Sequence, residues 1–152
     1  MASFTRVLLL VGVLAGFGSA TSLADDTLVL DEFEGSVVVV DFWASWCVPC
    51  RRSFPWLNEM HAKYGEDGLV IIGVNLDANR KDADAFLTDY PAAFRIYYDT
   101  EAVLAEEFGV EAMPSSFVIG RDGEIMARHL GFKVKRQQEY EAILVEALGV
   151  NQ

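Results

Sequence analysis

The chain has 152 residues, of which 52% are hydrophobic, and this length suits a single domain with a substantial apolar core. Its formal net charge of −11 at pH 7 argues against nucleic acid or an anionic membrane surface as a partner. The chain has two cysteines, Cys47 and Cys50, which lie three positions apart. A disulfide that closes so short a loop removes little entropy from the unfolded chain, so we do not expect the pair to serve stability.

Residues 1–24 have the layout of a secretory signal peptide. Arg6 supplies a positive charge, an apolar run of eleven residues follows at 7–17, and small residues offer cleavage after about Ala20 or Ala24. The run is well short of the roughly 20 apolar residues that span a bilayer. We therefore expect a mature chain in the periplasm, with no stable membrane insertion after cleavage.

Residues 27–152 predict a single α/β domain. In chain order we expect a lead-in with an edge strand (27–34), a strand (36–42), a helix (51–64), a strand (69–76), a helix (81–90), a strand (94–98), a helix (101–108), two strands (115–119 and 124–130) and a closing helix (135–148). Alternating strands and helices predict parallel strand pairings, and the final hairpin, which turns at 120–123, adds antiparallel ones. The expected result is a central mixed β-sheet flanked by helices.

The cysteine pair follows the first buried strand directly and stands at the predicted start of a helix. Free backbone N–H groups and the helix dipole favour a thiolate there and lower its pKa. We therefore expect Cys47 to be the attacking nucleophile and Cys50, one turn inside, to be the thiol that resolves the mixed disulfide. Pro49 suits the first turn because it has no N–H that would need a partner.

Three other roles compete for a Cys-x-x-Cys pair. A zinc site would need more ligands, but there is no second cysteine pair, and His61 and His129 lack ligand spacing. A haem attachment site would have a histidine after Cys50, where this chain has Arg51. We therefore expect no metal and no cofactor. The spacing alone does not exclude an inert disulfide, which remains an alternative.

Several further features occur in order between residues 36 and 148. They are the segment VDFWASWCVPC at 40–50, Pro55 in the following helix, GVEAMP at 109–114, FVI at 117–119 and the Asp122-Gly123 turn. Together they resemble the thioredoxin superfamily, most closely its TlpA/ResA/DsbE-like branch of exported thiol–disulfide oxidoreductases. The resemblance implies a thioredoxin fold and a redox-active cysteine pair.

The resemblance also implies roles for individual residues. The implied catalytic residues are Cys47, Cys50 and Asp41. The implied substrate-binding residues flank the cysteines or lie across from them, and they are Trp46, Val48, Pro49, Met113 and Pro114. In such proteins the last two form a cis-proline loop, whose backbone pairs with the extended chain of the substrate.

Asp41 lies six positions before Cys47 in an apolar strand, where a carboxylate is costly unless it has a task. In thioredoxins an aspartate at this place lies behind the resolving cysteine and relays its proton, whereas the TlpA-like branch more often has asparagine. The alternative is a carboxylate hydrogen-bonded at a strand end. The lysine that thioredoxins place on the next strand is absent from residues 72–75, so we expect burial to raise the pKa of Asp41.

Ser53 departs from ResA-like reductases, which have a glutamate three residues after the second cysteine. Pro49 resembles the reducing members of the superfamily. We expect a protein-disulfide reductase, in cytochrome c maturation or periplasmic redox homeostasis, although Ser53 weakens the first of these. A disulfide oxidase or isomerase and a non-enzymatic binding or chaperone module are the alternatives. The expected partners are proteins with disulfides and a membrane thiol-relay protein as electron donor, and the chain itself is expected to be a monomer.

Overall fold

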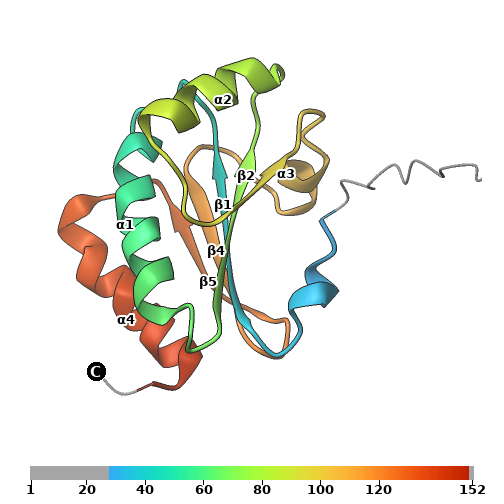
Figure 1. Cartoon of the computed structure of the whole chain (residues 1–152). Helices are drawn as coiled ribbons and strands as arrows, with labels where there is room; N and C mark the ends of the chain where they lie inside the picture. Colours follow the sequence, from blue (N-terminus) through green and yellow to red (C-terminus); the bar gives the residue numbers. More distant parts are fainter. Residues whose placement is uncertain (1–27, 151–152) are drawn as a thin grey trace, which may run out of the picture.

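A five-stranded mixed sheet, in the order β3-β2-β1-β4-β5, forms the centre of the computed structural model, which describes residues 28–150 (Figure 1). Its strands are β1 (Val37–Trp43), β2 (Leu69–Asn75), β3 (Arg95–Tyr98), β4 (Ser115–Ile119) and β5 (Ile125–Leu130). The α-helices are α1 (Cys50–Tyr64), α2 (Arg80–Asp89), α3 (Val103–Glu107) and α4 (Gln137–Leu148), and the 3₁₀ helices are η1 (Leu30–Phe33) and η2 (Val134–Arg136). The predicted α/β order is confirmed.

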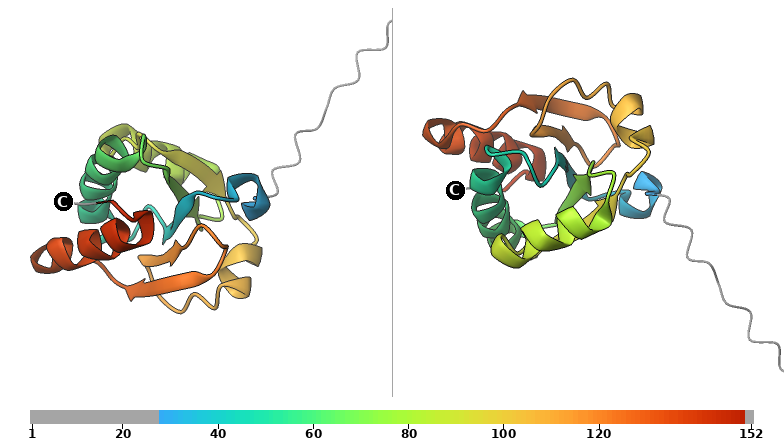
Figure 2. Two further views of the ribbon diagram at one scale, coloured as in Figure 1. Left: turned by 90° about the horizontal axis from the view of Figure 1, so that it is seen from below. Right: turned by 90° about the horizontal axis from the view of Figure 1, so that it is seen from above.

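Strand β1 is the middle of the sheet, and all seven of its residues are buried. It pairs in parallel with β2 and antiparallel with β4, while β3 joins β2 in parallel and β5 joins β4 antiparallel. Helices α1, α2 and α4 pack on one face of the sheet, and α3 and η1 pack on the other (Figures 1 and 2). Because β1 is covered on both faces, its sequence is almost continuously apolar. Its C-terminal end leads the chain directly to the cysteines.

The edge strand expected at 27–34 is wrong for the part of this segment that the structure describes. Residues 30–33 form η1, and Leu28, Leu30 and Phe33 pack against the core on the α3 side of the sheet. Their spacing of two and then three suits a helical turn better than the strict alternation of a strand. The predicted signal peptide, 1–24, lies outside the described residues.

Helix α3 begins two residues later than predicted because a buried carboxylate caps it. Asp99 Oδ1 accepts the N–H of Val103 at 2.9 Å, and Oδ2 accepts the N–H of Ala105 at 3.0 Å. Such N–H groups have no partner inside a helix. Within residues 28–150, no helix has both the length and the apolar character that a bilayer crossing requires.

Gly73 of β2 lies where the core has no room for a side chain. A Cβ atom there would lie 2.9 Å from Ile96 Cδ1, 3.0 Å from Phe94 Cε2 and 3.2 Å from Trp43 Nε1. We expect Gly73→Ala to lower the free energy of unfolding by about 1–3 kcal/mol in urea denaturation, the usual cost of overpacking. Ile96→Val removes the nearest atom, so the double variant should regain part of this loss. If the losses of stability in the two single variants simply add in the double variant, the predicted contact between residues 73 and 96 is contradicted.

Candidate active site

Cys47 and Cys50 form a disulfide at the N-terminal end of α1, with Cα atoms 5.3 Å apart. Cys50 is the first residue of α1, and Cys47 lies in the turn before it. The prediction that Cys50 lies one turn inside the helix is therefore wrong. Cys47 is 3% exposed and Cys50 is 0% exposed. The backbone N–H of Cys50 donates a hydrogen bond to Cys47 Sγ at 3.3 Å. Cys47 is therefore the slightly more exposed of the two cysteines, and the start of the helix supplies its sulfur with a donor.

The charges around the start of α1 favour a negative sulfur. The first turn has no acidic residue, and Arg51 and Arg52 follow the second cysteine as exposed side chains. Positive charge and free N–H groups at a helix N-terminus stabilise a thiolate. We therefore expect these groups to favour the thiolate of Cys47 once the disulfide is reduced.

Apolar side chains surround the disulfide. Trp46 is 66% exposed and Val48 is 57% exposed, and Pro49 between them and the helix is partly buried. Met113 packs against the core cluster that contains both cysteines. The Met113–Pro114 peptide bond is cis, and β4 begins directly after it at the sheet end where β1 leads to the disulfide. The structure thus brings the predicted substrate-binding residues to one end of the sheet.

Asp41 is completely buried in the middle of β1, and its side chain points to the face of the sheet that α1 covers, between Val39 and Trp43 of the same core cluster as the cysteines. Ser116 Oγ donates a hydrogen bond to Asp41 Oδ1 at 2.5 Å. Burial raises the pKa of Asp41 to about 7, against the opposing effect of this hydrogen bond. Its neighbour on β2 is Gly73, so no lysine partners it there. The predicted rise in pKa is confirmed, with burial as its cause.

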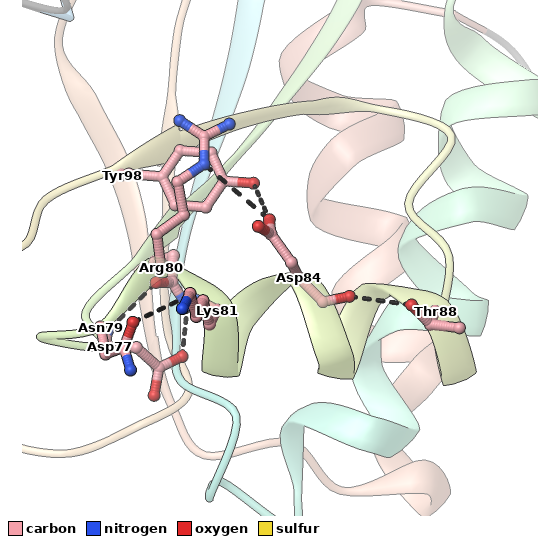
Figure 3. A network of polar contacts seen from close by, with 8 residues as sticks. Asp77, Asn79, Arg80, Lys81, Asp84, Thr88 and Tyr98 are labelled. Carbon is pink, nitrogen blue, oxygen red and sulfur yellow. Dashed lines mark hydrogen bonds and ion pairs between the residues drawn. The ribbon is translucent and has the colours of Figure 1, made fainter.

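Another buried carboxylate, besides those of Asp41 and Asp99, holds the loop that leads to the cysteines. Asp77 is 4% exposed and follows β2, just before α2 (Figure 3). Its Oδ2 accepts the N–H of Ser45 at 2.9 Å and its Oδ1 accepts the hydroxyl of Ser45 at 2.8 Å. The amide of the buried Asn75 donates to Oδ2 at 2.7 Å. Asp77 therefore ties the segment between β1 and Cys47 to the end of β2.

Figure 3 shows the polar contacts that hold α2 against β3. Asn79 caps the helix by accepting the N–H of Lys81 at 3.1 Å. The guanidinium of Arg80 lies 4.0 Å from the centre of the Tyr98 ring and 3.9 Å from Asp84 Oδ1. The Tyr98 hydroxyl donates to the same carboxylate oxygen at 3.3 Å. These contacts hold the start of α2, which follows the segment that contains Asp77.

Asp77→Ala is expected to lower the free energy of unfolding by about 3 kcal/mol, because a hydrogen bond to a charged group contributes about 1.5–3 kcal/mol and the removed carboxylate leaves buried donors unpaired. The exchange rate of the disulfide should fall as well, since the Ser45 segment loses its anchor. Urea denaturation and a disulfide-reduction assay check both. Glu59→Ala, which changes an exposed acid of α1, is the control; equal effects of the two variants would contradict the anchoring role.

Sequence reasoning did not identify the polar groups that support the cysteines. They are Ser45, Asn75, Asp77 and Ser116. Two polar residues at the end of a buried strand, Asn75 within it and Asp77 just after it, were a usable signal, whereas nothing distinguished Ser116 along the chain. Trp43 is fully buried and packs in the core. Between residues 28 and 150, no three His, Cys, Asp or Glu side chains lie close enough together to hold a metal ion.

Comparison with known proteins places the chain in a family. A family model described as Redoxin matches residues 17–144. The thiol–disulfide oxidoreductase ResA of Bacillus thuringiensis subsp. konkukian is 32% identical over 119 residues, which are 78% of this chain and 69% of that protein.

Solved structures agree with this assignment. A crystal structure described as a thiol:disulfide interchange protein DsbE from Chlorobium tepidum is 45% identical, has a TM-score of 0.77, and matches 79% of this chain and 85% of its own. StoA from Bacillus subtilis, 24% identical over 73% of this chain and 84% of its own, has the same fold with a TM-score of 0.64. With the Cys47–Cys50 disulfide at the start of α1, these matches confirm the predicted resemblance. The chain therefore belongs to the Redoxin family, as a TlpA/ResA/DsbE-like thiol–disulfide oxidoreductase of the thioredoxin superfamily.

Proposed function

We propose that the chain is an exported protein-disulfide reductase, which passes two electrons from Cys47 and Cys50 to disulfides of other proteins. One observation supports this most strongly. Cys47 lies just before α1, its sulfur accepts the N–H of Cys50, and its neighbours in the chain, Trp46 and Val48, are exposed. A sulfur that accepts an N–H at a helix start, with exposed apolar residues on either side in the chain, suits attack on a protein disulfide.

Reduction takes two exchange steps. The Cys47 thiolate attacks one sulfur of the substrate, a Cys47–substrate bond forms, and the first substrate thiolate leaves and takes a proton from water. Cys50 then gives its proton to Asp41 and attacks Cys47 Sγ. The Cys47–Cys50 disulfide forms, the second substrate thiolate leaves, and the substrate has gained two electrons.

The surface around the disulfide would bind the substrate chain. Trp46, Val48 and Pro49 offer apolar contact to the residues that flank the substrate disulfide, and Met113 faces the same core cluster as the cysteines. The backbone at Pro114, at the start of β4, is the segment beside which an extended substrate would pair.

The remaining parts of the proposal concern direction and setting. Pro49 supports the reducing direction, residues 1–24 support export to the periplasm, and a thiol-relay protein of the membrane would restore the dithiol of the monomeric chain. Ser53, in place of a glutamate, favours general periplasmic redox homeostasis over cytochrome c maturation. Its hydroxyl bonds the carbonyl of Cys50 at 3.1 Å and supplies no acid to the thiols.

A redox titration of the purified protein in glutathione buffers tests the direction, with the oxidised fraction read by alkylation and mass spectrometry. We expect a potential near the value of about −270 mV for thioredoxin, rather than about −120 mV for DsbA. A potential in the oxidant range would overturn the reductase proposal and favour a disulfide oxidase.

A further inference from the structure

Three polar side chains form one row across the sheet, on the face that α1, α2 and α4 cover. Strand pairing places Asp41 of β1 opposite Ser116 of β4, and Ser116 opposite His129 of β5. The serine hydroxyl already bonds the carboxylate. Asp41 Oδ2 and His129 Nε2 are buried and have no hydrogen-bond partner among the described residues. Because buried polar groups are nearly always paired, unpaired atoms at both ends of one row call for a reason.

Ser116 and His129 both line one small cavity, together with Trp56 of α1 and Tyr140 of α4. Its volume is about 20 Å³, which has room for about one water molecule. The serine hydroxyl and the imidazole nitrogen supply the polar partners that such a water needs. His129 itself is only partly buried and lies on the edge strand, so it joins the row to solvent.

We propose that Ser116, a water molecule in this cavity and His129 form the path by which the proton taken from Cys50 leaves Asp41 for solvent. The path rests on the proposed function, since it serves the second exchange step. Protonated Asp41 gives its proton to Ser116 Oγ, and the serine gives its own hydroxyl proton to the water. The water gives a proton to His129 Nε2, and the imidazolium releases one proton to solvent. No electrons move, and rotation of the hydroxyl and the water restores the starting state.

The charges along the row suit such a transfer. Burial raises the pKa of Asp41 to about 7, and burial also lowers the pKa of His129 below its usual 6.5, helped by Arg136. Glu139, which is ion-paired with Arg136, acts in the opposite direction, and the ring of Tyr140 lies 4.8 Å from the imidazole. The lowered pKa of His129 means that its imidazolium gives up a proton readily, which suits the last step of the path, the release to solvent.

The two exchange steps can be timed separately by stopped flow, with reduced protein and an aromatic disulfide that releases a coloured thiolate at each step. His129→Gln keeps a polar side chain that cannot take up a proton near neutral pH. We expect an unchanged first phase and a second phase about tenfold slower, since acid–base groups contribute about 10²–10⁴-fold and the path carries part of this. Ser116→Ala, which removes the hydroxyl link, should slow the same phase.

Imidazole in the buffer should restore the second phase of His129→Ala, because it can replace the missing base, and a purely structural role would not respond to it. His61→Gln is the matched control, since His61 is the other histidine of the chain and also has a buried, unpaired ring nitrogen. An unchanged second phase in His129→Gln, or no rescue of His129→Ala by imidazole, would overturn the path. A wild-type protein that releases no coloured thiolate would instead overturn the proposed function.

Discussion

Cys50→Ser is expected to hold protein partners covalently through Cys47, whereas Cys47→Ser is expected to hold none. Without the second thiol the mixed disulfide cannot be resolved, so the bond between Cys47 and the substrate persists. Cys47→Ser removes the more exposed cysteine and leaves Cys50, which is 0% exposed, so we expect a folded substrate not to reach it. Both variants should reduce insulin at no more than the uncatalysed rate.

Capture of each variant from a periplasmic extract, followed by mass spectrometry without reductant, measures the trapped partners. Ser53→Ala is a matched control, because it also changes a buried side chain of the first turns of α1 but keeps both cysteines. It should release its partners as the wild type does. Equal trapping by Cys50→Ser and Cys47→Ser would show that Cys47 is not the attacking sulfur.

Asp41→Asn is expected to stabilise the oxidised protein by about 4 kcal/mol above neutral pH, since each pKa unit corresponds to about 1.4 kcal/mol. The pKa of this buried carboxyl is raised from 3.8 to about 7. Between these values the folded protein keeps a proton that the unfolded chain has lost, so stability falls as the pH rises through this window. Asparagine cannot ionise, keeps the size of the side chain and can still accept the hydrogen bond of Ser116.

Urea denaturation of the disulfide form from about pH 4 to about pH 8 measures this effect. The free energy of unfolding of the wild type should fall as the pH rises across this window. Asp41→Asn should not show this decrease. Glu59→Gln removes an exposed carboxylate on α1 and should follow the wild type. The same pH dependence in wild type and Asp41→Asn would show that Asp41 is ionised at little cost.

The strands and helices could be predicted because their signals are local. The apolar runs that became β1 and β2 need burial on both faces, and only the middle of a sheet provides it. The prediction of an edge strand at 27–34 was wrong because the few apolar residues there fit either a strand or a helical turn. Packing against the α3 side of the sheet favours the turn, which is η1. The start of α3 depended on the side chain of Asp99, which lies before the predicted helix and accepts the N–H groups of Val103 and Ala105.

The cysteines could likewise be found from spacing and position, because a helix start acts on residues next to it. The supporting groups could not. Ser116 meets Asp41 across 75 positions of sequence, and this contact depends on the register between β1 and β4. Asp77 meets Ser45 across 32 positions, through the parallel pairing of β1 and β2. Registers of this kind are set by the packed sheet, so a single sequence predicts that Asp41 is buried but not what bonds it.

The stoichiometry of a single turnover tests the exchange through Cys47 and Cys50 most directly. Reduced protein is mixed with an oxidised protein substrate, and alkylation followed by intact-mass measurement counts thiols on both. We expect one substrate disulfide to open for each Cys47–Cys50 disulfide that forms. Two results would contradict the exchange. Either the substrate disulfide opens while Cys47 and Cys50 stay as thiols, or Cys47 and Cys50 form a disulfide while the substrate disulfide stays intact.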